Sequence, residues 1–388
     1  MRLEPPVPAE VLAAIRAPLE SSGAARADAP LLQPLNLLLD LAGEAMRARL
    51  FVVQAEGGAE SCLRPDFTVA IARRHIEGGR AAGAYWYEGA AFRAASGDDR
   101  PEEFVQVGLE MFSPGGGAVE AADAEIAGLA WQAASAGGRD DLSLWLGDVA
   151  LFGAFVDSLD LPAALAARLK RVAGRPRLLW SELSRTTGRP PEGGALAGLL
   201  AGLSEAQAGA LLEEVWSLAG VEPVGGRGPA EIAARLVRKA EAAQAPALSD
   251  AQAEAVRAFM AIDDSPAYAF ARMRALAGPR DAALKAALAG WEQRLGDLAR
   301  AAPADRIRFT PALGHAFEYY DGLTFEVRSD AVGPERPVAV GGRYDGLLAR
   351  LGGQHGVGRA VGCMVRPWRA WIGGEDGAGG AAGSGGVQ

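Results

Sequence analysis

The run from Glu103 to Phe112 constrains the fold of this chain more than any other segment. Its apolar side chains alternate with polar or small ones, as the order Val105, Gln106, Val107, Gly108, Leu109, Glu110, Met111 shows. A period of two residues predicts a half-buried β-strand with one face packed on helices. The other face presents an amide and a carboxylate on either side of a glycine. That face suits either an ordinary solvated surface or the floor of a small polar pocket.

Length and composition exclude several classes of protein. A chain of 388 residues can hold one large core and a smaller domain. Charge-free stretches such as 126–138 fall short of the roughly 18–20 apolar residues that a membrane span needs. The first residues include Arg2, Glu4 and Glu10 and no apolar core, so we expect no signal peptide. A net charge of −9 argues against a non-specific nucleic-acid binder, which must neutralise phosphates.

Cysteine and histidine usage predicts neither a disulfide framework nor a metal site. The two cysteines, Cys62 and Cys363, lie far apart in the sequence, which fits a reducing cytoplasm. The three histidines, His75, His315 and His355, lack metal-ligand spacing. We therefore expect a cytoplasmic protein without a metal or another cofactor.

The first half of the chain is expected to mix helices and strands. Apolar periodicity predicts an amphipathic helix from Pro34 to Arg49, a strand at residues 51–53 and a helix that begins near Val69. A helix at 121–136 and a strand at 142–146 follow. Almost everything from Ala150 to Ala301 has helical character and is expected to form an insertion.

Strand character returns in the last part of the chain. Residues 306–309 and 338–340 predict strands, and residues 317–327 predict a hairpin whose turn is Asp321-Gly322. The segment 373–388 consists almost entirely of glycine, alanine and serine, which predicts a disordered tail.

Four segments in order resemble the catalytic core of class II histidyl-tRNA synthetases. They are LRPDFT at 63–68, the pair 87–93 and 103–110, HAFEYYDG at 315–322, and GGRYDGL at 341–347. The likeness spans about residues 1–372 and implies an α+β fold, with a mainly antiparallel sheet flanked by helices and a dimer interface at roughly 34–56. The implied divisions are a first core part at 1–149, the helical insertion at 150–301 and a second core part at 302–372.

The chain departs from this family at the positions that handle ATP. Where the family has a glutamate for adenine, this chain has Ala95, and its two ATP-contacting arginines correspond to His315 and Val365, with Arg366 one residue out of register. Removing one such transition-state group costs about 10²–10³ in rate, which argues against an efficient adenylating enzyme. Because few residues follow 365, we also expect no counterpart of the synthetase's anticodon-binding domain.

The resemblance implies that the amino-acid pocket is kept. Asp66 and Thr68, with Gln106 near the same end, correspond to residues around the α-amino group. Arg93 corresponds to the residue for the carboxylate. Glu110 is expected to face the imidazole of histidine, with Tyr320 and Tyr344 nearby.

Simpler roles remain open for the same residues. Asp66 or Thr68 could cap the helix that follows them. Arg93 could pair with Glu88 or Glu103. One of Tyr319 and Tyr320 is expected in the core, and Tyr344 could do no more than open a helix.

A synthetase-like core that keeps the amino-acid residues and loses the ATP residues resembles the regulatory subunits of ATP phosphoribosyltransferase. This resemblance implies a non-catalytic chain of histidine biosynthesis that binds L-histidine. Its partners would be a short-form catalytic subunit and a second copy of itself, within a hetero-octamer, with no nucleic acid and no membrane. Two alternatives remain: a truncated synthetase-like ligase that activates an amino acid for a non-tRNA acceptor, and a scaffold whose pocket is vestigial.

Overall fold

The structure is a computed structural model whose backbone is described at 2–42, 44–55, 57–58, 60–95, 100–116, 119–173, 176–184, 248–313, 319–352 and 358–374, with isolated positions between 207 and 214. The chain divides into two compact units, residues 1–160 with 258–388, and residues 161–257. His315 and most of the expected tail lie outside the described residues.

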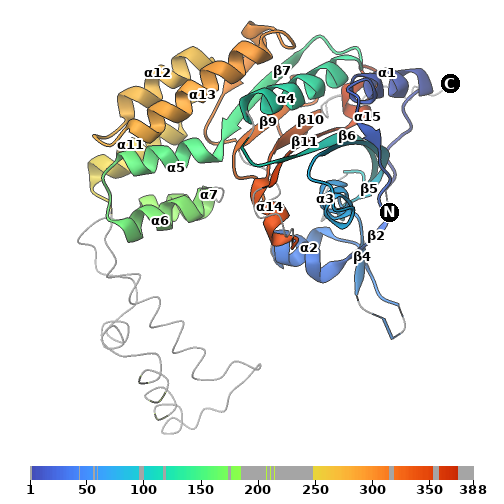
Figure 1. The fold of residues 1–388 in the computed structure, drawn as a ribbon, viewed down its shortest axis with the longest axis horizontal. Helices are drawn as coiled ribbons and strands as arrows, with labels where there is room; N and C mark the ends of the chain where they lie inside the picture. The colour runs from blue at the N-terminus through green and yellow to red at the C-terminus, as the bar shows by residue number, and fades with distance from the viewer. Residues whose placement is uncertain are drawn as a thin grey trace, which may run out of the picture. The chain divides into compact units, whose positions relative to one another are not determined.

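An eight-stranded sheet forms the centre of the first unit, and the run from Glu103 to Phe112 lies within it (Figure 1). In spatial order the strands are β1 (Ala25–Arg26), β5 (Gly83–Phe92), β6 (Glu103–Pro114), β11 (Gly358–Val365), β10 (Ala339–Arg343), β9 (Leu323–Ser329), β7 (Leu142–Asp148) and β8 (Ile307–Phe309). Neighbours pair antiparallel except at the two edges, where β1–β5 and β7–β8 are parallel. The mainly antiparallel sheet expected from the sequence is confirmed.

Helices cover both faces of this sheet. On one face α4 (Val119–Ser135) packs across β9, β10 and β11, and its small apolar residues allow close approach. The opposite face is covered by α3 (Thr68–Glu77), which contacts β6 (Figure 1). The remaining helices of this unit are α1 (Ala9–Glu20), α2 (Leu35–Ala42), α5 (Val149–Ser158), α12 (Pro266–Leu276), α13 (Ala282–Leu298), α14 (Asp345–Arg350) and α15 (Pro367–Ala370), with a short 3₁₀ helix at Ala304–Arg306.

The amphipathic segment expected as one helix over 34–49 is divided. The α-helix α2 ends at Ala42, and a 3₁₀ helix runs from Glu44 to Arg49. A glycine follows Ala42 in the sequence, and glycine has low helix propensity. The segment lies beside a small sheet formed by β2 (Leu32–Pro34), β4 (Ser61–Leu63) and β3 (Val52–Val53).

The second unit is helical where it is described, and it is shorter than the expected insertion. Its helices are α6 (Ala163–Val172), α7 (Pro176–Leu183) and most of α11 (Asp250–Met260). Residues 150–160 and 258–301 belong to the first unit instead. The reason is that α13 packs on α4 and α5, and the Trp291 side chain donates a hydrogen bond to Asp148 at 2.7 Å.

The hairpin expected at 317–327 is not formed over its described part, residues 319–327, and residues 317 and 318 lie outside the described residues. Tyr319 to Gly322 are not in a strand, and β9 has β10 on one side and β7 on the other, so neither edge is available. Asp321 instead accepts hydrogen bonds from the backbone N–H groups of Asp345 and Gly346, at 3.0 and 2.6 Å. It thereby stabilises the start of α14 and leaves Tyr319 and Tyr320 beside the sheet.

A search of the described helices for a stretch long and apolar enough to cross a membrane finds none.

Candidate ligand-binding site

The polar face of β6 is buried and not solvated. Gln106 and Glu110 are 0 % and 1 % exposed, although the side chains of the strand alternate between two faces as expected. The neighbouring strands and α3 cover this face. Of the two interpretations of the alternating run, the floor of a polar pocket is the one that the structure supports.

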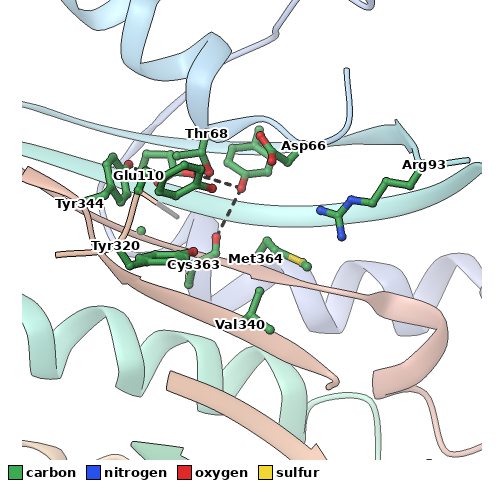
Figure 2. A pocket seen from close by; sticks show the side chains of 12 residues that line it. Asp66, Thr68, Arg93, Glu110, Tyr320, Val340, Tyr344, Cys363 and Met364 are labelled. Carbon is green, nitrogen blue, oxygen red and sulfur yellow. Dashed lines mark hydrogen bonds between the residues drawn. The ribbon is translucent and has the colours of Figure 1, made fainter. Parts of the chain in front are cut away.

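A cavity of about 30 Å³ lies over this face of the sheet (Figure 2). Six of the seven residues expected at an amino-acid pocket line it, namely Asp66, Thr68, Arg93, Glu110, Tyr320 and Tyr344. Six further residues that the sequence analysis did not select complete the lining: Tyr87, Tyr319, Val340, Gly362, Cys363 and Met364. The seventh expected residue, Gln106, lies behind the lining and donates to the Met364 sulfur at 3.6 Å.

Glu110 accepts three hydrogen bonds from hydroxyl groups. One carboxylate oxygen accepts from the Thr68 hydroxyl at 2.7 Å and from the Tyr87 hydroxyl at 3.3 Å. The other accepts from the hydroxyl of Tyr344. Residues from α3, β5 and the start of α14 therefore converge on one carboxylate and fix its direction.

Burial changes the acid–base behaviour of this carboxylate. It raises the pKa of Glu110 to about 7, because a charged carboxylate is costly away from water. The hydrogen bonds from Tyr344 and Thr68 oppose this change, whereas the nearby Asp66 adds to it. At neutral pH Glu110 can therefore present either a charged acceptor or a protonated donor to a bound group.

Two glycines leave the space that this arrangement needs. Gly362 is the ladder partner of Glu110, and a Cβ at position 362 would lie 1.7 Å from the Glu110 carboxylate. Gly108 is the partner of Tyr87, and a Cβ there would lie 2.3 Å from the tyrosine hydroxyl. Both side chains can therefore lie across the sheet only because their partners lack a side chain.

Asp66 is the second carboxyl group of the cavity. It is 7 % exposed, and neither of its carboxylate oxygens has a hydrogen-bond partner of normal geometry among the described residues. Burial raises its pKa, while the charge of Arg93 and the nearby N–H groups of Thr68 and Val69 oppose the rise. An unpaired buried carboxylate is costly, so this position is suited to a ligand that brings positive charge or N–H donors.

Arg93 lies at the end of the cavity away from Glu110 and Tyr344, with Asp66 between them in the view of Figure 2. Its Nε donates to the carbonyl oxygen of Pro65 at 2.9 Å, which fixes the guanidinium relative to the LRPDFT segment. Burial lowers the pKa of Arg93, and the charge of Asp66 opposes this. A guanidinium at this end is placed to receive an anionic group.

Gln106 adds one more unused acceptor on the same face of β6. Its side-chain oxygen is buried and has no hydrogen-bond partner in the described part of the chain. Its side-chain nitrogen reaches only the weakly accepting sulfur of Met364. This amide is therefore only partly satisfied, like the carboxylate of Asp66.

The simpler roles considered for these residues have mixed outcomes. The helix α3 begins at Thr68, its N-cap residue is Phe67, and no side-chain capping bond is formed there. Glu88 pairs with Arg16 at 2.9 Å. Tyr344 does directly precede α14, but its hydroxyl also donates to Glu110. Tyr319 belongs to the buried core, which confirms the expectation for one residue of this pair, and both Tyr319 and Tyr320 also line the cavity.

Two of the three positions at which the resemblance implies a lost ATP contact lie within the described residues. The backbone N–H of Ala95 donates to Glu102 at 3.4 Å. Val365 is fully buried in β11 between Val107 and Ala339, on the face away from the cavity. Among the described residues, no group of three or more histidine, cysteine, aspartate or glutamate side chains is arranged to hold a metal ion.

Comparison with known proteins places this architecture in a family. The family model for histidyl-tRNA synthetase matches residues 8–222 and 227–366. A protein of Brucella anthropi described as an ATP phosphoribosyltransferase regulatory subunit is 34 % identical over 353 residues, covering 89 % of this chain and 93 % of that protein. A protein of Chelativorans with the same description is 35 % identical, covering 84 % and 87 %.

The chain belongs to the family of ATP phosphoribosyltransferase regulatory subunits.

Solved structures support the same fold assignment. A structure from Bacillus halodurans, described as an ATP phosphoribosyltransferase regulatory subunit/histidyl-tRNA synthetase, matches with a TM-score of 0.62 at 20 % identity, covering 92 % of this chain and 76 % of that chain. A histidine–tRNA ligase subunit from Alicyclobacillus acidocaldarius matches with a TM-score of 0.54 at 22 % identity, covering 95 % and 94 %. The class II synthetase-like core of this family member is therefore established.

Proposed function

We propose that this chain is the non-catalytic regulatory subunit of an ATP phosphoribosyltransferase, and that its cavity binds L-histidine as a feedback inhibitor. The observation that carries the second part is the buried carboxylate of Asp66, whose two oxygens lack partners among the described residues. The oxygen of Gln106, which is also unpartnered in the described part of the chain, lies behind the lining on the same side of the sheet. An α-ammonium group has three N–H donors and one positive charge, and it is the natural partner for the Asp66 carboxylate.

The rest of the cavity fits the other groups of the amino acid. Arg93 would receive the carboxylate, as guanidinium groups commonly do. Glu110 would meet the imidazole at the opposite end. With a pKa of about 7, it can accept from an imidazole N–H or share a proton with the ring. Tyr320 and Tyr344 would stack beside the ring.

The present size of the cavity supports a regulatory role. About 30 Å³ holds one or two water molecules and not an amino acid, so histidine can enter only if the lining side chains move outward. A ligand that needs an opened cavity binds the open state better than the closed one. Such a difference in affinity is the thermodynamic condition for a ligand to shift an equilibrium between two states of an assembly.

The proposal assigns the phosphoribosyl transfer to a short-form catalytic subunit. The placement of Ala95 and Val365 supports the absence of adenylating activity in this chain, because neither side chain can contact a nucleotide through a hydrogen bond or an ion pair. We further propose that the chain dimerises and that the dimer assembles with catalytic subunits into a hetero-octamer.

Reconstitution tests the proposal. ATP phosphoribosyl transfer by a short-form catalytic subunit from the same organism is measured with and without this chain, across a titration of L-histidine. We expect the chain to raise the rate and to make it sensitive to histidine. A rate and a histidine response that the chain leaves unchanged would contradict the regulatory role, and histidine-dependent exchange of pyrophosphate into ATP by this chain alone would favour a ligase.

The variant Glu110→Ala separates the pocket from the assembly. We expect it to weaken inhibition by histidine while complex formation and the uninhibited rate stay close to those of the wild type. Glu88→Ala is the matched control, because Glu88 lies on β5 and pairs with Arg16 away from the cavity. Unchanged inhibition in Glu110→Ala would favour a scaffold with a vestigial pocket.

A further inference from the structure

A buried ion pair joins the N-terminal segment to the end of β11. Glu4 and Arg366 are 6 % and 4 % exposed, and one guanidinium nitrogen of Arg366 donates to one carboxylate oxygen of Glu4. The other oxygen of Glu4 accepts from the backbone N–H of Val105 at 3.3 Å. The Glu4 carboxylate therefore accepts hydrogen bonds from β6 and from Arg366 at the same time.

The backbone holds Glu4 in this position. The N–H of Glu4 donates to the carbonyl of Glu103 at 2.9 Å, and the carbonyl of Arg2 accepts from Glu102 and Glu103 at 2.8 and 3.1 Å. Residue 3 thus pairs with the start of β6 like a short added strand. The carboxylate is presented to Arg366 by an ordered segment.

This ion pair lies at the cationic end of the cavity. The guanidinium of Arg366 is 3.6 Å from the centre of the Phe104 ring, and that of Arg93, which lines the cavity, is 5.4 Å from the same centre. Burial and the charges of Arg369 and Arg93 together lower the pKa of Arg366 to about 9, and Glu4 opposes them. Three guanidinium groups therefore gather here, and such groups bind carboxylates and phosphates.

We propose that Glu4 is a specificity-determining residue, whose carboxylate occupies the anion position on Arg366 so that this end of the cavity accepts a carboxylate and refuses the phosphates of a nucleotide. The Nε of Arg366 has no partner among the described residues, so its donors are not exhausted by Glu4. A polyanion that approaches Arg93 meets less positive charge, because Glu4 already neutralises the charge of Arg366. This inference concerns phosphate exclusion and does not depend on which amino acid the cavity binds.

The test uses the full chain with ATP and inorganic pyrophosphate as probes, measured by isothermal titration calorimetry. Glu4→Gln keeps the size of the side chain and one acceptor oxygen, but it removes the charge and replaces the second acceptor oxygen with an NH2 donor. We expect it to bind both probes about tenfold more tightly than the wild type, or better. The gain should disappear in the double variant Glu4→Gln/Arg366→Gln, because the unmasked cation is then gone.

Glu102→Gln is the matched control. It removes the same charge from the same region, where the Glu102 carboxylate accepts from the N–H of Arg2 at 3.0 Å. It leaves the ion pair with Arg366 intact, so no gain in pyrophosphate binding is expected. An equal gain in Glu102→Gln, a gain that persists in the double variant, or ATP binding by the wild type as tight as that of Glu4→Gln would overturn the proposal.

A stability measurement covers the case in which Glu4→Gln folds poorly. Millimolar pyrophosphate should raise its Tm more than it raises that of the wild type, since the anion replaces the lost counter-charge. A Tm that pyrophosphate leaves unchanged in Glu4→Gln, together with unchanged binding, would show that Glu4 is only a structural tie.

Discussion

Glu110 and Gly362 face each other across the ladder between β6 and β11, and the carboxylate of the first occupies the space that a side chain on the second would fill. The pair explains how a charged group can lie flat over a sheet. Gly362 lies within the regular strand β11, so its backbone conformation does not require a glycine. The geometry of the cavity therefore depends on a residue that makes no polar contact with a ligand.

Gly362→Ala should damage the cavity more than any conservative change of its polar residues. The new Cβ would lie 1.7 Å from the Glu110 carboxylate, so the carboxylate must leave its three hydroxyl partners. We expect the histidine concentration for half-inhibition to rise about tenfold or more, with a loss of about 1–3 kcal/mol in unfolding free energy from overpacking. Half-inhibition and urea unfolding are the measurements.

Gly296→Ala is the control for that variant. This glycine lies in α13 with nothing near the position of its Cβ, so alanine should raise stability by up to about 1 kcal/mol and leave inhibition unchanged. Inhibition of Gly362→Ala that matches the wild type would contradict the assigned role of Glu110.

The stability of the chain should fall between pH 4.5 and 7 because of Glu110. Its pKa is raised from 4.5 to about 7 in the folded state, so the folded protein binds a proton that the unfolded chain releases. The favourable contribution is complete below pH 4.5 and is lost as the pH rises through 7. The full difference is roughly 3 kcal/mol. Tm measured from pH 5 to 8 should therefore decline less in Glu110→Gln than in the wild type, and parallel curves would contradict the assigned pKa.

Asp66→Asn should separate binding from stability. Losing the charge removes the partner for an ammonium group, so histidine binding should weaken about tenfold or more. Removing the charge relieves the burial cost of the carboxylate but also removes its attraction to Arg93 and to the N–H groups of Thr68 and Val69, so the unfolding free energy should change by no more than about 1 kcal/mol. Imidazolepropionate, which lacks the ammonium, serves as the comparison ligand in calorimetry. Equal losses for both ligands would show that Asp66 does not meet the ammonium.

Asp123→Asn tests the buried ion pairs that join α4 to α13 and β10. Asp123 on α4 is fully buried and accepts from Arg343 at 2.6 and 2.8 Å and from Arg294 at 2.8 Å. Neutralising it removes the carboxylate that pairs with Arg294 and leaves Arg343 with Asp345 as its acidic partner, which costs up to about 3–5 kcal/mol. Asp297→Asn, which breaks a pair with the exposed Arg300, should cost less than about 1 kcal/mol. Similar urea midpoints for the two variants would contradict this difference.

Local patterns predicted several elements well. The period of two residues in 103–112 and the helical character near the end of 150–301 correspond to β6 and α13, because each pattern reflects a face that must be buried wherever the element packs. The Asp321-Gly322 turn failed as a hairpin signal. Its strength depends on a free strand edge, and β7 and β10 take both edges of β9.

The residues of the site also divide into those that the sequence predicted and those that it did not. Asp66, Thr68, Arg93, Glu110, Tyr320 and Tyr344 were expected from short motifs, and the fold brings these six together around one cavity. Gln106 stands behind that lining. Gly362 and Met364 could not be selected, because their importance comes from being in register with Glu110 and Gly108 on a strand some 250 residues away in the sequence.

The sequence by itself determined the kind of fold, the family and most of the polar residues of the cavity, because periodicity and motif spacing are properties of nearby residues. Only the tertiary structure decided that the polar face of β6 is buried, that Asp66 lacks hydrogen-bond partners in the described part of the chain, and that Glu4 pairs with Arg366. Burial and ion pairing depend on which strands and helices pack together. Strand pairing brings together segments that are far apart in the sequence, and no local pattern encodes that pairing.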